Sequence, residues 1–434
     1  MLLRFSVTNF ASIADEQELL LTASNLSGDE ADLLYSPILP KHGVLPSILI
    51  YGPNASGKSN LLSALQTMAD MVENSHLKGG PKSSLPYDPF RLDEEWKKRP
   101  TSFEMEFILS GLRYSYSFSF HSEHVEHEKL TVNSGAGASV LYTRTGQDFV
   151  FGRKLTGGLK LIKEITRANS LFVSAAAQNN HDLLTKVYNY FCSISFESVT
   201  APDAFSAQMR ISTEFKHSIS QKVISFLSNI GTGVVEYRAV DLDFTDEHKE
   251  RSKKLSDALK SAFSSAFGRD IEFPLDDGPG KMIELGHQGK DGATVFLSLD
   301  DESAGTRRLL TTLPGIFKSL ETGGILVLDE VDASLHTLAA DLVMALFAHK
   351  ETNPLGAQIL ATTHDTNLLD SEHLRRDQVW FAEKSREGKT QVYPLSDFKP
   401  RKSESMEKGY LQGRYGAIPR GSISKLIRQN EELA

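Results

Sequence analysis

Apolar and polar residues alternate in several stretches of the first 165 residues. Leu2–Val7 repeats with a period of two, and so do 103–108 and 114–120, which Ser110-Gly111 separates. This period predicts strands with one buried face, and two of them joined by a short turn form an antiparallel hairpin. Residues 124–165 continue as short strand-like segments and turns. We therefore expect an antiparallel β subdomain in this region.

Other apolar runs are continuous instead of alternating. They cover 48–51, 325–328 and 358–363, and helical spacing marks 305–321 and 335–350. Continuous apolar strands are typical of a sheet that is covered on both faces. The strand–helix–strand order therefore predicts a mostly parallel sheet with helices packed against it.

The middle of the chain has a different character. From about 168 to 265, apolar residues recur every three or four positions, as in 183–188 and 219–227, which predicts helices. We expect an α/β protein with a mostly parallel sheet, an antiparallel β subdomain and a helical insertion. The expected divisions are an N-terminal lobe (1–165), the helical insertion (166–280), a C-terminal lobe (281–398) and a tail (399–434).

Composition narrows the class of protein. The 434 residues allow two or three domains, and the net charge of −9 gives no overall attraction to nucleic acid. The single cysteine, Cys192, excludes an internal disulfide, and its apolar neighbours predict a buried thiol. No stretch approaches the length of a membrane span and no signal-peptide pattern is present. We expect a soluble, cytoplasmic protein.

The strand at 48–51 leads directly into a phosphate-loop pattern, G-x-x-x-x-G-K-[ST]. Its residues are Gly52, Pro53, Asn54, Ala55, Ser56, Gly57, Lys58, Ser59 and Asn60. Glycines let backbone N–H groups close around phosphate oxygens, Lys58 can reach the β- and γ-phosphates, and the Ser59 hydroxyl can ligate Mg²⁺. The helix that follows adds partial positive charge. The chain is therefore expected to bind ATP with Mg²⁺.

Two carboxylates follow the apolar strand 325–328. Asp329 is suited to the Mg²⁺ shell, and Glu330 is suited to polarising the attacking water. His364 follows the strand 358–363 and is expected to sense the γ-phosphate. These side chains should meet because open α/β sheets bind ligands at the carboxyl ends of their strands.

A third segment, Ser303, Ala304 and Gly305, opens the helix near 305–321. A helix N-terminus made of small residues exposes N–H groups that can receive a γ-phosphate. An ordinary helix N-cap is the alternative interpretation. Arg307-Arg308, just beyond, could contact a nucleotide or nucleic acid, or could form surface salt bridges.

Together these motifs resemble the ABC-type ATPases of the SMC, RecF and OLD group. The phosphate loop, a signature-like Glu302–Thr306, Asp329-Glu330, a D-loop at Asp332–Ser334 and a switch histidine, His364, carry the resemblance. More narrowly, the chain is similar to compact ATPases of bacterial anti-phage and abortive-infection operons, of the AbiL or AriA type. The segments that carry this narrower likeness are Arg4–Ile13, Asp377–Lys384 and Glu407–Pro419.

This resemblance implies a mechanism and partners. Two copies would meet head to tail, in a dimer or a higher homo-oligomer, with ATP between Lys58 of one and Ser303–Gly305 of the other. Glu330 would activate water and His364 would report the γ-phosphate. A separately encoded effector, such as a nuclease or toxin, is implied because no nuclease motif follows residue 365. Two departures are Ser-Ala-Gly-Thr in place of Ser-Gly-Gly, and Asp88–Asp93 without a Q-loop glutamine.

The tail 399–434 combines basic residues with Tyr410 and Tyr415. Such a composition can contact nucleic acid or dock on an acidic partner. His121, His124 and His127 match no metal-ligand spacing and predict a polar hairpin end. The leading interpretation is an ATPase sensor or scaffold of phage defence. A RecF-like DNA-repair ATPase is the alternative, and a transporter subunit is a distant third.

Overall fold

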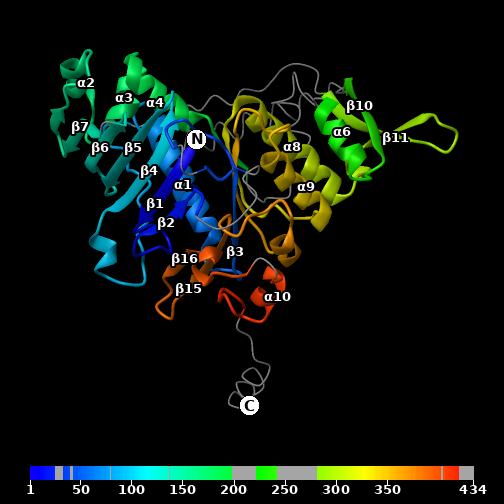
Figure 1. Ribbon diagram of the computed structural model, residues 1–434. Coiled ribbons are helices and arrows are strands. Elements are labelled where there is room, and N and C mark those ends of the chain that lie inside the picture. Colours follow the sequence, from blue (N-terminus) through cyan, green and yellow to red (C-terminus); the bar gives the residue numbers. More distant parts are fainter. Residues whose placement is uncertain are drawn as a thin grey trace, which may run out of the picture. The chain divides into compact units, whose positions relative to one another are not determined.

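The computed structural model describes residues 1–24, 33–39, 43–78, 80–135, 137–197, 221–241, 281–401 and 404–419. Figure 1 shows its course. The chain forms two compact units. Unit 1 comprises Met1–Val199 and Lys318–Ala434, and unit 2 comprises Thr200–Phe317. Among the described residues, no helix is both long and apolar enough to cross a membrane.

The antiparallel β subdomain is confirmed as a seven-stranded sheet of unit 1, in the order β2-β1-β4-β5-β6-β7-β8. Its strands are β1 (Leu2–Thr8), β2 (Gln17–Leu20), β4 (Thr101–Leu109), β5 (Leu112–Phe120), β6 (Val125–Asn133), β7 (Ala138–Thr145) and β8 (Asp148–Phe151). The predicted hairpin joins β4 to β5. Ser110 and Gly111 both have positive φ, as tight two-residue hairpin turns require.

The mostly parallel sheet is confirmed as well. Its order is β16-β15-β3-β14-β13-β9, and only β16 runs antiparallel to its neighbour. The strands are β3 (Ser47–Tyr51), β9 (Ile194–Glu197), β13 (Ile325–Leu328), β14 (Gln358–Thr362), β15 (Val379–Lys384) and β16 (Thr390–Pro394). Every residue of β3, β13 and β14 is buried, which explains their continuous apolar runs.

Helices cover this framework in unit 1. They are α1 (Lys58–Asn74), α2 (Leu159–Ile165), α3 (Phe172–Gln178), α4 (Asp182–Cys192), α9 (Thr337–Ala348) and α10 (Met406–Leu411), with short 3-10 turns η2 (Trp96–Lys98), η4 (Thr366–Asp370) and η5 (Leu395–Phe398). α1 contacts β1, α3 and α4, whereas α9 contacts β3. A parallel sheet needs such covering helices to bury its faces.

Three local expectations differ from the structure. α2 occupies 159–165, where turns and strands were expected, because Ile162 buries its side chain from a helical turn. α3 and α4 pack on α1 and belong to unit 1, so the unit boundary does not fall at the predicted 165/166. Cys192 is exposed, since it ends α4 beyond the buried Phe191.

Unit 2 is smaller. It contains α6 (Gln221–Asn229), β10 (Val234–Asp241), β11 (Lys281–Gln288), β12 (Thr294–Ser298) and η3 (Leu299–Asp301), and α8 (Ala304–Thr322) begins in it. The strands form an antiparallel sheet in the order β10-β11-β12. α6 confirms the helix expected at 219–227, whereas β10 is a strand inside the predicted helical insertion. The rest of that insertion, 198–220 and 242–280, lies outside the described residues.

A buried ion pair ties α3 to the antiparallel sheet. Glu128 on β6 and Arg144 on β7 lie 3.4 Å apart, and neither side chain is exposed. Glu128 accepts hydrogen bonds from the hydroxyls of Tyr116 (2.9 Å) and Tyr142 (2.7 Å) and from two backbone N–H groups of α3. Burial and the carboxylate raise the pKa of both tyrosines, so the hydroxyls remain donors. Burying these charges is tolerable only while all partners are present.

We predict that Glu128→Ala lowers the free energy of unfolding by about 3–5 kcal/mol, because it leaves the Arg144 guanidinium buried and without its carboxylate. Thermal unfolding followed by circular dichroism measures the effect. Glu123→Ala is the matched control, since Glu123 is exposed and surface substitutions cost less than about 0.5 kcal/mol. Equal unfolding temperatures for the two variants would contradict a role for this pair in stability.

Candidate functional site: the phosphate loop and its sheet edge

The loop between β3 and α1 has a backbone that only glycine fits at two positions. Gly52 (φ +154°) and Gly57 (φ +103°) both lie in a region that L side chains rarely adopt. A Cβ on Gly52 would lie 2.2 Å from the carbonyl oxygen of Ala382, and one on Gly57 would lie 2.1 Å from Thr390 Oγ1. The close approach of β15 and β16 therefore dictates both glycines.

The N-terminus of α1 is open to an anion. Gly57 occupies the N-cap position and provides no side-chain cap, and the first turn contains no acidic residue. The first N–H groups of a helix have no partner within it and carry partial positive charge. Ala55, with φ +62°, bends the preceding backbone in the same loop. This arrangement fits the phosphate groups of a nucleotide.

Lys58 folds back over the loop. Its Nζ donates to the carbonyl oxygens of Gly52 (2.7 Å) and Pro53 (3.4 Å), and it lies 3.2 Å from Nε2 of His364. The residue is only 6% exposed. Burial lowers the pKa of Lys58, and the negative charges of Asp329 and Glu330 oppose that shift. The structure thus brings the predicted lysine and the predicted switch histidine together.

Thr362, the last residue of β14, fixes the two predicted carboxylate residues. Its Oγ1 donates to Asp329 Oδ1 (2.5 Å) and accepts the backbone N–H of Glu330 (2.7 Å). Its carbonyl oxygen accepts the N–H of Val331 at 2.9 Å. Glu330 has a positive φ of 50°, a strained conformation for a residue with a side chain. Thr362 is fully buried, so this turn is held from the neighbouring strand.

The backbone of His364 is held in place by Asp332. Its N–H donates to the carboxylate of Asp332 at 3.2–3.3 Å, while its side chain is exposed toward Lys58. Asp332 belongs to the segment predicted as a D-loop. The carboxyl ends of β3, β14 and β13 therefore bring Lys58, His364 and Asp329-Glu330 to one edge of the sheet, as expected from strand order.

A chain of hydrogen bonds supports the phosphate loop from outside. Asn60 Nδ2 donates to Ser12 Oγ (2.6 Å), which lies 2.7 Å from Thr390 Oγ1, and Thr390 Oγ1 donates to the carbonyl oxygen of Ser56 (2.9 Å). Sequence reasoning missed Ser12, Thr390 and Thr362. Ser12 and Thr390 are remote from the motifs along the chain. Thr362 lies close to His364 in sequence, but a polar residue at a strand end gives no distinctive pattern.

The segment expected to contain a Q-loop lies beside this support. The N–H of Ala11, next to Ser12, donates to the carbonyl oxygen of Asp88 at 2.6 Å. Asn9 accepts the N–H of Phe90 at 3.0 Å. The loop around residue 88 is therefore tied to the segment that contacts the phosphate loop, although it contains no glutamine.

Ser303, Ala304 and Gly305 lie in unit 2. Ser303 Oγ accepts the N–H of Thr306 at 3.1 Å, so Ser303 caps α8, and Ala304 and Gly305 are the first residues of that helix. Arg307 donates to the carbonyl oxygens of the preceding residues Leu299 and Glu302. The guanidinium thus fixes the loop before the helix, a role that neither sequence interpretation anticipated.

The described part of the tail corrects the interpretation that its tyrosines contact nucleic acid. Tyr410 and Tyr415 are buried, 6% and 0% exposed, and both stack on Phe381. They are therefore core residues and are not available to stack on bases. The tail's remaining basic residues from 420 onward lie outside the described residues.

The three histidines predicted to end a hairpin lie around the β5–β6 turn. His121 and His124 are in the turn, and His127 is an exposed residue of β6. The backbone N–H of His121 donates to the carbonyl oxygen of His124 at 3.0 Å, which closes the turn. Across the parts of the chain that the structure describes, no three His, Cys, Asp or Glu side chains gather closely enough to hold a metal ion.

A phosphate loop between a buried strand and a helix, with carboxylates and a histidine on the neighbouring parallel strands, defines the P-loop class of nucleotide-binding α/β proteins. Comparison with known families is more specific. The chain belongs to the family described as "AAA domain, putative AbiEii toxin, Type IV TA system", which matches residues 47–370.

Among the solved structures similar to this chain is the SMC head domain from Thermotoga maritima. It is 16% identical, the match covers 91% of this chain and 98% of that chain, and the TM-score is 0.36. A comparison with curated proteins finds no match.

We predict that Gly57→Ala disturbs the loop beyond the cost of backbone strain. Gly111→Ala is the matched control, because Gly111 also has positive φ (+73°) but a Cβ there would meet no atom within 4 Å. Strain alone costs about 1–2 kcal/mol, and the clash with Thr390 should make Gly57→Ala the more destabilised variant in thermal unfolding. Equal losses would show that β16 does not constrain the loop.

Proposed function

We propose that this protein binds and hydrolyses ATP, and that it acts as a sensor or scaffold in an anti-phage, abortive-infection type of defence system. The observation that carries the ATPase proposal is the placement of Lys58 at the uncapped N-terminus of α1. There it lies 3.2 Å from His364, at the sheet edge that also carries Asp329 and Glu330. The family description, with its AbiEii toxin and toxin–antitoxin system, supports the defence setting.

The geometry supports the following proposed roles. The loop Gly52–Asn60 binds the phosphates through backbone N–H groups, which all of its residues except Pro53 carry. Lys58 exchanges the Gly52 carbonyl oxygen for phosphate oxygens. Ser59 and Asp329 hold Mg²⁺, which supplies neutralisation of phosphate charge when it is bound. Glu330 accepts a proton from water as the water attacks the γ-phosphorus, and ADP leaves with the electron pair of the broken P–O bond. His364 contacts the γ-phosphate beside Lys58.

The protein would control an effector through its own ATP-dependent oligomerisation. Ser303, Ala304 and Gly305 would complete the nucleotide site of a second copy in a head-to-tail homodimer or higher homo-oligomer. Their position at the start of α8 supports this role, since a helix N-terminus suits a γ-phosphate. A separately encoded nuclease or toxin would be held or released with the nucleotide state, as in AbiL- or AriA-like systems. The burial of Tyr410 and Tyr415 removes one reason to favour the DNA-repair alternative.

We predict that Glu330→Gln retains ATP binding but lowers kcat by about 10²–10⁴, the usual contribution of a general base. The trapped ATP should also increase the fraction of dimer or higher oligomer, measured by light scattering after size-exclusion chromatography. Steady-state phosphate release measures the rate.

Lys58→Ala serves as the comparison variant, because it should lose ATP binding in calorimetry as well as hydrolysis. Wild-type phosphate release from Glu330→Gln would contradict the proposed base. ATP binding and hydrolysis without any change in assembly would contradict the proposed scaffold function and leave the ATPase proposal standing.

Thr362 is predicted to be a positioning residue for the Asp329-Glu330 turn. Thr362→Val keeps the shape but removes the hydroxyl that bridges Asp329 and the Glu330 backbone, so kcat should fall about 10-fold or more and the Mg²⁺ requirement should rise. Thr362→Ser restores the hydroxyl and should recover both values. Similar behaviour of Val and Ser variants, in kcat and in Mg²⁺ dependence, would assign Thr362 to packing alone.

A further inference from the structure

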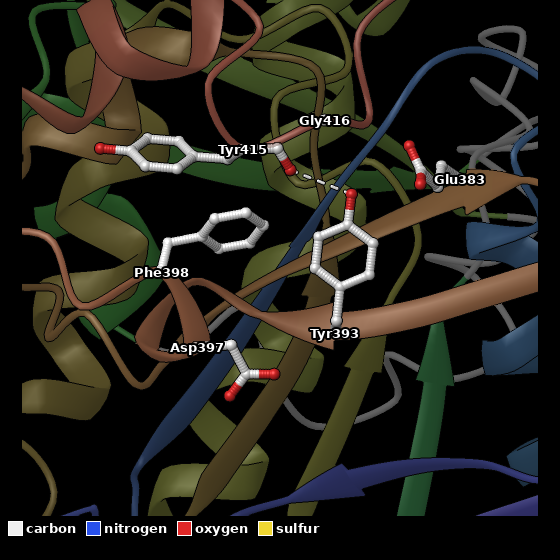
Figure 2. A pocket seen from close by; sticks show the side chains of 6 residues that line it. All are labelled: Glu383, Tyr393, Asp397, Phe398, Tyr415 and Gly416. Carbon is white, nitrogen blue, oxygen red and sulfur yellow. Dashed lines mark hydrogen bonds between the residues drawn. The ribbon is translucent and has the colours of Figure 1, made fainter.

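Unit 1 contains a hollow lined by residues of β15, β16, η5 and the tail (Figure 2). Its volume is about 360 Å³, and its lining residues are Glu383, Tyr393, Asp397, Phe398, Tyr415 and Gly416. The lining includes two aromatic rings that reach solvent, those of Tyr393 and Phe398, together with two carboxylates and a glycine, whereas the ring of Tyr415 beside them is fully buried. None of these residues belongs to the phosphate loop or to its supporting hydrogen bonds, so the nucleotide site does not explain them.

The aromatic walls are fixed in place. The Tyr393 hydroxyl donates to the carbonyl oxygen of Tyr415 at 3.0 Å, the dashed line in Figure 2. The ring centroid of Phe398 lies 5.8 Å from that of Tyr393 and 5.4 Å from that of Tyr415. Gly416 has φ +70°, and a Cβ there would lie 2.6 Å from the Tyr393 hydroxyl. The glycine thus permits the close approach of the tail to β16.

Both charged side chains of the lining are carboxylates. Glu383 is partly buried, and its Oε2 accepts the N–H of Ala417 at 3.0 Å, which orients the carboxylate. Asp397 is exposed at the rim. Among the described residues, the lining contains no Lys, Arg or His. The nearby Arg414 pairs with Glu404 at 2.9 Å and lies 5.8 Å from the centroid of the buried Tyr415 ring. Electron-rich ring faces and carboxylates attract a cation and repel phosphate.

We propose that this pocket receives an arginine side chain of a partner protein. A guanidinium is planar, so it can stack on aromatic rings while its N–H groups donate to carboxylates. The volume exceeds what a bare cation needs and is sufficient for a guanidinium with its aliphatic stem. Phe398 is 39% exposed, so part of its ring is accessible to a ligand.

The pocket is connected to the phosphate loop by direct contacts. Phe381 stacks on Tyr415 and Tyr410, and it also packs against Tyr51, the residue before Gly52. β16 carries both Thr390, which supports the loop, and Tyr393, which lines the pocket. A partner held here would therefore touch the elements that border the nucleotide. That this partner is the controlled effector rests on the proposed function, whereas the pocket chemistry does not.

The test uses the full chain without nucleotide and the peptide acetyl-Gly-Arg-Gly-amide, with the isosteric citrulline peptide as its uncharged counterpart. Saturation-transfer NMR titrations at millimolar peptide should give an affinity for the arginine peptide at least about tenfold above that for citrulline. Phe398→Ala and Asp397→Asn should each reduce arginine-peptide affinity about fivefold or more. Both residues are exposed, so both variants are expected to fold.

Tyr35→Ala and Glu387→Gln are the matched controls, since these side chains are also exposed and do not line the pocket. Both should bind the arginine peptide like the wild type. The proposal is overturned by absent binding of the arginine peptide, by equal binding of citrulline, or by no effect of the two pocket variants. Tighter binding of spermidine, lost in the same variants, would make this a polyamine site instead. ATP calorimetry on the wild type reports separately on the proposed function.

Discussion

The site depends on the placement of one positive charge, the ammonium group of Lys58. The residue is only 6% exposed, so its charge has to be compensated by the loop carbonyls and by the carboxylates beyond them. Gly52 O at 2.7 Å is the nearest partner. A carbonyl dipole is a weaker partner than a phosphate oxygen, which carries formal charge. Lys58 is therefore held near the loop by the weaker partner, the Gly52 carbonyl oxygen, and a phosphate oxygen of a nucleotide would be the stronger one.

Other features of the site preserve this arrangement. The hydrogen-bond chain from Asn60 through Ser12 and Thr390 ends on the Ser56 carbonyl and fixes the loop backbone. Thr362 does the same for the turn that carries Glu330, whose positive φ requires external support. Thr362 lies on β14, next to β13 in the sheet, whereas Thr390 lies on β16, beyond β15, and Ser12 lies between β1 and β2. The geometry is therefore a property of the whole parallel sheet and of the β16 edge.

The sequence predicted the motifs better than their surroundings. Lys58, Asp329, Glu330 and His364 could be placed because a local pattern follows a buried strand, and parallel strands bring such ends together. Ser12 and Thr390 could not, since they lie 378 positions apart and only the fold brings them together. The same limit explains Tyr410 and Tyr415. Their basic neighbours indicated a surface, yet the rings fill the space beside Phe381.

The most direct measurement is a crystal structure of the protein with Mg²⁺ and a non-hydrolysable ATP analogue. The account predicts the triphosphate in the Gly52–Ser59 loop, with Lys58 Nζ moved from the Gly52 carbonyl oxygen onto the β- and γ-phosphates. Ser59 and Asp329 should lie in the metal shell, and His364 should face the γ-phosphate. A nucleotide bound elsewhere, or Lys58 still on Gly52 beside a bound triphosphate, would contradict it.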